Sequence, residues 1–163
     1  MLQDLNLRKA IEFAVKTEQI GARVYERLAR QFADDAELKQ LFEHLGQEEV
    51  GHERQFQALL DKVPETGGED VSHEQQQYLR AMTVSEIFSG DEQGLIKNLD
   101  QVKTREDALE RALNMEKATL GYYKAMQDIL GSSEALDGVI AAEKRHVVHI
   151  AKYLLTGEEV KGV

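Results

Sequence analysis

Two copies of a Glu-x-x-His motif are the residues of this sequence best suited to chemistry. One copy pairs Glu49 with His52, and the other pairs Glu143 with His146. On a helix, a spacing of three places both side chains on one face, on adjacent turns. Carboxylate and imidazole are ligands of iron, manganese and zinc. One such motif is common and means little, but two in one chain indicate metal binding.

Two further glutamates, Glu18 and Glu116, lie in the middle of apolar stripes. Four stripes of this kind follow helical steps of three and four residues, and none contains a lysine or arginine. The stripes are Ile11, Val15, Glu18, Ala22, Tyr25, Phe32; Leu38, Leu41, Leu45, Glu49, His52, Phe56, Leu59; Leu109, Ala112, Glu116, Leu120, Tyr123, Leu130; and Leu136, Val139, Glu143, His146, Ile150, Leu154. Each predicted helix therefore carries one glutamate toward the core.

Four converging carboxylates need a compensating charge. An ionised carboxylate that leaves water loses on the order of several kcal/mol of solvation free energy, and neighbouring carboxylates also repel one another. Two divalent cations would balance the four negative charges and leave the imidazoles neutral. The sequence therefore predicts two metal ions held by six residues, which are Glu18, Glu49, His52, Glu116, Glu143 and His146.

An internal repeat supports this prediction. Residues 10–25 align without gaps on residues 108–123, and the segments around the two Glu-x-x-His motifs align as well. The identity is modest, but the matches fall on the chemically unusual positions. The matched pairs are Glu18 with Glu116, Tyr25 with Tyr123, Glu49 with Glu143, and His52 with His146. The two halves of the chain look like copies of one helical hairpin.

Tyr25 and Tyr123 lie two turns beyond the glutamates of their own helices. Two interpretations are open for both: apolar packing with the hydroxyl near the surface, or a hydrogen bond to a ligand carboxylate in a catalytic site. Other polar residues near the motifs are predicted to be solvated or flanking rather than ligands. These are Glu48, Glu53, His44 and His149, while His73 lies apart in a connecting segment.

The elements that must position these residues are four long helices. Helical periodicity predicts them over residues 7–33, 35–61, 105–130 and 133–155. Asn6, Asp34 and Thr104 are the expected N-caps, and Gly131 is the expected stop after the third helix.

The segment between the second and third helices, residues 62–103, is a long connection. It is predicted to hold a shorter helix over Ser72–Phe88, with Ser72 and Gln75 as its cap. A connection of this length can join opposite ends of a bundle. The predicted fold is all-α: one ferritin-like four-helix bundle over residues 1–163, built from two antiparallel hairpins and one long crossover.

Composition narrows the class of protein. The chain has 163 residues, with 42% hydrophobic and 31% charged residues, one proline, no cysteine and a net charge of −10. The lack of cysteine excludes disulfides, thiolate metal sites and thiol catalysis. The acidic balance makes nucleic acid and anionic membranes poor partners. The N-terminal residues contain no apolar run typical of a signal peptide, so a cytoplasmic location is expected.

These motifs resemble the rubrerythrin branch of the ferritin-like superfamily, across the four predicted helices. The matching features are Glu18 with Tyr25, EEVGH with Glu49 and His52, Glu116 with Tyr123, and EKRH with Glu143 and His146. The resemblance implies that these glutamates and histidines hold two irons, with Glu49 and Glu143 bridging them. It also implies a cytoplasmic, commonly dimeric peroxide reductase.

Two features depart from that family pattern. Rubrerythrins usually carry a four-cysteine rubredoxin domain that feeds electrons to the irons, and this sequence has no cysteine. Any electrons must therefore come from a separate protein. Peroxidase relatives also carry an extra glutamate one turn after the residue that matches Glu116, where this chain has Thr119, with Gly21 at the repeat position. Neither departure affects the expected metal binding, whereas both count against peroxidase activity.

The leading hypothesis is a non-haem di-iron oxidoreductase that reduces peroxide or dioxygen as Fe(II) is oxidised. One alternative is an iron-binding or storage protein with ferroxidase turnover as a loading step, and another is an interaction scaffold. Manganese or zinc could replace iron at such ligands. The expected partners are a small oxidant, an external electron-donor protein and a second copy in a homodimer, with no nucleic acid or membrane.

Overall fold

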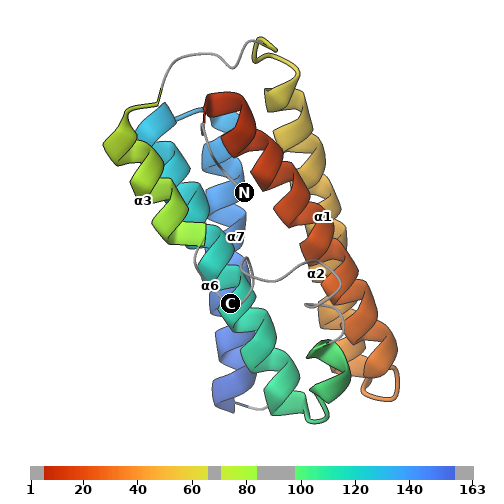
Figure 1. Cartoon of the computed structure of the whole chain (residues 1–163). Coiled ribbons are helices and arrows are strands. Elements are labelled where there is room, and N and C mark those ends of the chain that lie inside the picture. Colours follow the sequence, from red (N-terminus) through yellow and green to blue (C-terminus); the bar gives the residue numbers. More distant parts are fainter. Residues whose placement is uncertain (1–5, 66–70, 84–97, 157–163) are drawn as a thin grey trace.

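The structure is a computed structural model that describes residues 6–65, 71–83 and 98–156. Within these residues every regular element is helical (Figure 1). The long helices are α1 (Leu7–Gln31), α2 (Ala36–Leu60), α6 (Arg105–Leu130) and α7 (Glu134–Thr156), and the shorter ones are α3 (His73–Thr83) and the 3-10 turn η1 (Leu99–Gln101). The all-α prediction is confirmed, and each end of the four long helices lies within two residues of its predicted place.

The four long helices form two antiparallel hairpins packed into one bundle. Helix α1 pairs with α2 and α6 pairs with α7, while α1 also contacts α6 and α2 contacts α7. Helix α2 ends at the top of the bundle in Figure 1 and α6 begins at the bottom, so the chain between them crosses its full length. This is the predicted ferritin-like topology. Helix α3 packs against α6, and the rest of the predicted Ser72–Phe88 helix lies outside the described residues.

Most helix ends follow from the predicted caps. The side chain of Asn6 accepts from the amide of Lys9 at 2.9 Å, and that of Thr104 accepts from the amide of Asp107 at 3.1 Å. Ser72 and Gln75 bond each other's backbone amides, as a capping box requires. Gly131 ends α6 with a φ of 78°, a backbone angle that residues other than glycine rarely adopt.

The predicted cap of the second helix is wrong by one residue. Asp35, not Asp34, accepts from the amide of Leu38 at 3.0 Å. Its carboxylate also accepts from Arg105 at 2.5 Å. Because Arg105 opens α6, a tertiary ion pair selects between the two adjacent aspartates. Sequence spacing alone could not predict this contact between Asp35 and Arg105.

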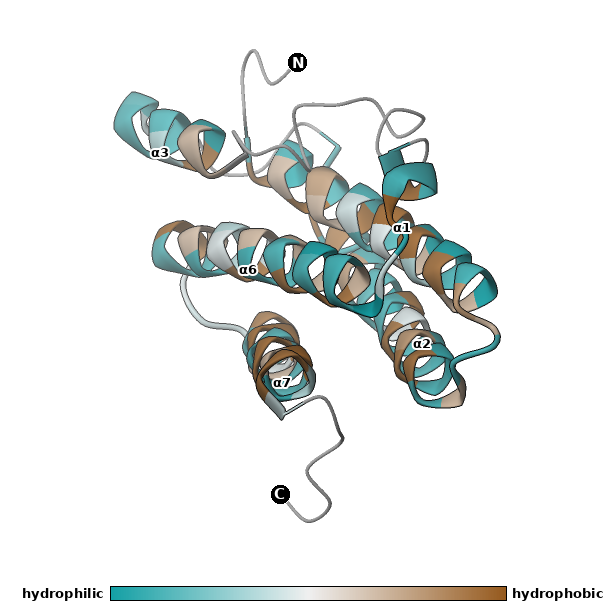
Figure 2. Cartoon of the chain, turned by 90° about the horizontal axis from the view of Figure 1, so that it is seen from below, coloured by the Kyte–Doolittle hydropathy of each residue, from teal (hydrophilic) through white to brown (hydrophobic). Residues whose placement is uncertain are grey.

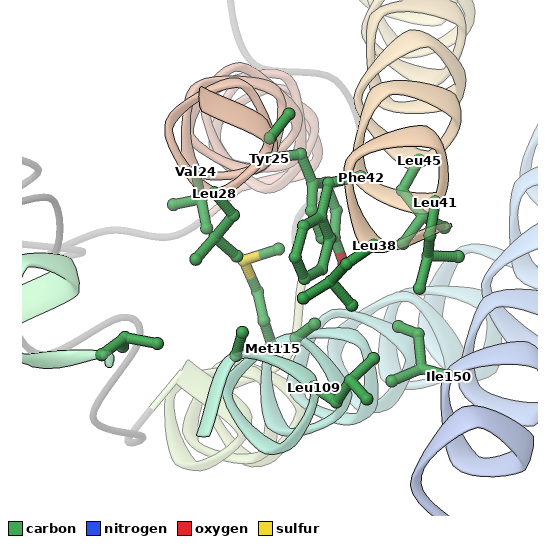
Figure 3. Close-up of a cluster of buried hydrophobic side chains, with 14 of the residues drawn as sticks. Val24, Tyr25, Leu28, Leu38, Leu41, Phe42, Leu45, Leu109, Met115 and Ile150 are labelled. Carbon is green, nitrogen blue, oxygen red and sulfur yellow. The ribbon is translucent and has the colours of Figure 1, made fainter. Parts of the chain in front are cut away.

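The core has two apolar clusters, one on each side of the bundle's middle. One gathers around Leu28, Leu38 and Ile150, with Tyr25 stacked on Phe42 at 5.9 Å between ring centroids (Figure 3). The other cluster includes Ile11, Phe56, Tyr122, Met126 and Val139. Along each long helix the buried polar residues fall between the two, so apolar side chains close off the bundle's middle from both ends.

The long helices are amphipathic, and each carries hydrophilic and hydrophobic residues side by side in the view of Figure 2. The centres of the predicted stripes are buried. Positions nearer their edges and ends are only partly buried, because a straight helix of 3.6 residues per turn turns its stripe gradually away from the core. These positions are Ala22, Phe32, Leu59, Leu120, Leu130 and Leu154. None of the described helices combines the length and apolar character needed to span a membrane.

Candidate metal centre

The six predicted ligands converge in the middle of the bundle. All six side chains are buried, with exposed fractions of 1–4%, and each long helix contributes at least one. They form two overlapping groups of four residues. Within each group, the ligand atoms all lie within 4.8 Å of one another. The first group is Glu18, Glu49, His52 and Glu143, and the second is Glu49, Glu116, Glu143 and His146.

Each group has one histidine facing its carboxylates. Nδ1 of His52 lies 3.1 Å from Oε1 of Glu143 and 3.4 Å from Oε2 of Glu18. Nδ1 of His146 lies 3.2 Å from Oε2 of Glu116 and 3.6 Å from Oε1 of Glu49. The two imidazole rings lie 5.6 Å apart between centroids. Because Glu49 and Glu143 belong to both groups, they have the positions of bridging ligands.

Several of these buried atoms have no hydrogen-bond partner of suitable geometry among the described residues. They are Oε2 of Glu18, Oε1 of Glu49, Oε1 of Glu143 and Nδ1 of His52. Buried polar groups are rarely left unsatisfied, because each one costs about 1–3 kcal/mol. All four belong to the two groups, where cations would satisfy them together. The donor set of carboxylates and imidazoles therefore fits two ions of iron or a similar first-row metal.

The pKa values of the carboxylates show how crowded the negative charge is. Burial, with repulsion from Glu18, raises the pKa of Glu49 well above its ordinary value. Burial also raises the pKa of Glu116 to about 7, and burial with repulsion from Glu116 raises that of Glu143 to about 8. Carboxyl groups of this kind retain protons that a bound cation displaces.

Glu18 and His52 are shifted toward their charged forms. Burial acts to raise the pKa of Glu18, but a hydrogen bond with Glu49 and the nearby His52 hold it below its ordinary value. Burial acts to lower the pKa of His52, but the carboxylates of Glu143 and Glu18 raise it to about 10. In its protonated form, His52 thus balances part of the negative charge of the surrounding carboxylates.

The two tyrosines contact the site in a crossed arrangement. The hydroxyl of Tyr123, on α6, donates to Oε1 of Glu18 on α1, and that of Tyr25, on α1, donates to Oε1 of Glu116 on α6. Both side chains are fully buried, and burial raises the pKa of each well above its ordinary value, so both remain donors. Of the two interpretations left open by the sequence, the hydrogen bond to a site carboxylate is the one observed.

The repeat positions Gly21 and Thr119 make different contacts with Glu49 and Glu143, the two glutamates shared by both groups. The hydroxyl of Thr119 donates to Oε2 of Glu143 at 2.9 Å. Gly21 has no side chain, and a Cβ atom there would lie 3.1 Å from Oε2 of Glu49. A small cavity of about 10 Å³, close to the space of one water molecule, lies between these two positions. It is lined by Thr17, Ile20, Gly21, Glu49, Met115, Glu116 and Thr119.

Glu48, which the sequence predicts to be solvated or flanking rather than a ligand, lies outside both groups but contacts one of their histidines. Its Oε2 lies 2.7 Å from Nε2 of His146 and 3.3 Å from Nε2 of His44. Partial burial acts to raise the pKa of Glu48, but His146 and His44 lower it below its ordinary value. The internal repeat does not indicate this contact, because the position that matches Glu48 is Ala142.

The remaining flanking residues lie outside the two groups, as predicted. His149 is half-buried and its ring packs on Tyr153 at 5.4 Å between centroids. Glu53 accepts from the amide of Gln19 at 2.7 Å. His73 is exposed on α3, and its Nε2 is 3.0 Å from the side-chain nitrogen of Gln77.

Comparisons with known proteins agree with this architecture. A family model for rubrerythrin matches residues 1–100, which include Glu18, Glu49 and His52. No curated protein matches the chain. A solved structure described as a ferritin-like diiron-carboxylate protein from Thermotoga maritima superposes with a TM-score of 0.75. It is 21% identical in sequence and covers 97% of this chain and 100% of its own, so the two share a fold. With a family model matched over more than half of its length, the chain belongs to the rubrerythrin family.

Proposed function

We propose that this chain is a non-haem di-iron oxidoreductase that reduces peroxide or dioxygen. The observation that carries the proposal is the sharing of Glu49 and Glu143 between two four-residue groups. A pair of shared carboxylates is the arrangement expected of two ions held side by side, rather than of one ion or of a structural ion pair.

The ligand assignment follows from the two groups. Glu18 and His52 would hold one ion, Glu116 and His146 would hold the other, and the two shared glutamates would bridge them. Bound as Fe(II), the pair supplies two electrons, which are enough to convert one hydrogen peroxide and two protons into two waters. The sequence has no cysteine, so we further propose that a separate protein returns the electrons.

The protein's own part is to hold the ligands and keep out bulk water. The apolar clusters on both sides of the centre exclude water, which strengthens the electrostatic interactions inside. Tyr25 and Tyr123 fix the two terminal glutamates through their hydroxyls. The small cavity beside Glu49 and Glu116 is the space that a small oxidant would enter.

A second candidate is an iron-binding protein that oxidises each load of Fe(II) once. Thr119 supports it, because this hydroxyl stands where the resemblance to peroxidase relatives calls for a further glutamate. A threonine hydroxyl cannot take the place of another iron ligand, as a glutamate carboxylate at this position could. The two candidates predict the same centre and differ in turnover.

Anaerobic reconstitution with Fe(II), followed by metal analysis, tests the centre. We expect close to two iron ions per chain, and fewer than about one would remove both candidates. Stopped-flow mixing with hydrogen peroxide in the presence of an external reductant then separates them. Repeated peroxide turnover supports the oxidoreductase, while one oxidation per site supports the iron-binding alternative.

A further inference from the structure

Glu48 breaks the two-fold symmetry of the centre. His146 faces the carboxylates with Nδ1 and faces Oε2 of Glu48 with Nε2, at 2.7 Å. A histidine that gives the Nδ1 lone pair to a metal ion carries its proton on Nε2. That proton would point at the Glu48 carboxylate, the hydrogen bond that commonly orients a metal-ligating imidazole.

The other half of the chain has no such group at the matching position. Glu48 directly precedes Glu49, and the residue directly before Glu143 is Ala142. In the internal repeat, Ala142 corresponds to Glu48 and His52 corresponds to His146, so Ala142 is the residue expected beside His52. Ala142 is buried, with 5% of its surface exposed, and its methyl group accepts no hydrogen bond. Of the two ligand histidines, only His146 therefore has a carboxylate from this repeat position.

A carboxylate bonded to the far nitrogen of an imidazole fixes the ring and makes its metal-binding nitrogen more basic. Loss of such a partner typically lowers metal affinity by roughly 10–100-fold. We infer that Glu48 is a positioning residue that makes the two metal positions unequal, so that the ion held by Glu116 and His146 binds more tightly than the ion held by Glu18 and His52. The inference rests on the proposed two-ion centre.

A purely structural role for Glu48 makes a different prediction. The residue is one-third exposed and also faces His44, whose side chain is 57% exposed. If Glu48 served only as a surface ion pair, its removal would change stability slightly and leave both metal affinities alone. Stepwise metal affinity is therefore the readout that separates the two roles.

Anaerobic calorimetric titration with Fe(II) tests the inference. We expect two binding steps in the wild-type chain, with affinities that differ by roughly 10–100-fold. Glu48→Ala should weaken the tighter step by a similar factor and leave the weaker step in place. Glu48→Gln should recover part of the loss, since its amide oxygen can still accept from Nε2. Glu43→Ala, which removes an exposed carboxylate from the same helix, is the matched control for lost charge.

Mössbauer spectra of protein loaded with one equivalent of ⁵⁷Fe(II) give an independent readout. The wild-type chain should show mainly one iron environment, and Glu48→Ala should show two. Equal affinities in the wild-type chain, or equal weakening of both steps in Glu48→Ala, would overturn the inference. If two ions per chain still bind, the proposed centre remains intact. Uptake of fewer than about one ion per chain would instead count against the centre itself.

Discussion

Tyr25 on α1 donates its hydroxyl proton to the carboxylate of Glu116 on α6, in the other half of the chain. Tyr123 on α6 makes the reciprocal bond to Glu18 on α1. Each tyrosine thus holds the glutamate of the opposite hairpin rather than that of its own. The two hairpins are tied together at the level of the candidate metal centre by a pair of buried, crossed hydrogen bonds.

Removal of either crossed bond should destabilise the metal-free protein. Tyr25→Phe leaves Oε1 of Glu116 without its donor in a fully buried setting, which should cost about 1–3 kcal/mol of unfolding free energy. Tyr123→Phe should behave alike through Glu18. Urea denaturation measures the change, and Tyr78→Phe, at a side chain that is 45% exposed, is the control. Unchanged stability in both buried variants would mean that the bonds contribute nothing.

Metal ions should stabilise the folded chain strongly. The buried atoms without partners, such as Oε1 of Glu49 and Oε1 of Glu143, are brought together only in the native state. A ligand that binds only that state adds about 2.7 kcal/mol when its free concentration is 100 times its dissociation constant. Anaerobic thermal unfolding with Fe(II), and again after chelation, should show a higher midpoint with metal. Coincident curves would argue for an interaction scaffold instead.

Gly21 should prove necessary for the position of Glu49. In Gly21→Ala the new Cβ would lie 3.1 Å from Oε2 of Glu49, so this carboxylate must shift by a few tenths of an ångström. We expect Fe(II) affinity to fall by about tenfold, as for other small disturbances around metal ligands. Anaerobic calorimetric titration gives the affinity.

Gly51→Ala is the matched control for this change, because a Cβ built there has no neighbour within 4 Å among the described residues apart from its own helix backbone and adjacent residues. It should leave Fe(II) affinity alone and stabilise α2 by about 1 kcal/mol through helix propensity. If Gly21→Ala bound iron as tightly as Gly51→Ala, the space beside Glu49 would have no role in metal binding.

Acid should remove the contribution of the Asp35–Arg105 ion pair. Burial acts to raise the pKa of Asp35, but the amide of Leu38 and the guanidinium of Arg105 lower it below the ordinary value of 3.8. A lowered folded-state pKa contributes stability that is present above the unfolded value and is lost as pH falls through the folded one.

Asp35→Asn tests this link, because asparagine keeps the N-cap and loses the charge. At pH 7 it should cost about 0.2–1 kcal/mol, the range for a partly exposed pair. The difference from the wild-type chain should shrink as pH falls from about 5 toward 2. Urea denaturation across this range measures it, and a gap that stayed constant with pH would show that the charge is not involved.

The six residues of the candidate centre could be picked out from the sequence because their signal is local and repeated. A glutamate in an apolar stripe is conspicuous, and the register between Glu18 and Glu116, and between Glu49 and Glu143, makes coincidence a poor explanation. The fold followed from helix length and from the long connection. The structure brings all six predicted residues together at one place.

What the sequence did not reveal depends on how the helices are rotated against one another. Glu48 reaches His146 from α2 to α7, a contact 98 residues apart along the chain. The partner of Tyr25 likewise required the packing of α1 on α6. The choice of Asp35 over Asp34 depended on Arg105. In each case a tertiary contact decided between choices that local spacing left equal.

The sharing of Glu49 and Glu143 also sets the order of events during synthesis. When the first hairpin leaves the ribosome, it carries Glu18, Glu49 and His52, but both four-residue groups also include Glu143 on α7, in the second hairpin. A nascent chain therefore cannot assemble either group until α7 has been synthesised and has left the ribosome. In the proposed two-ion centre, metal loading would follow the synthesis of α7, and a chain truncated before Glu143 should not retain the ions.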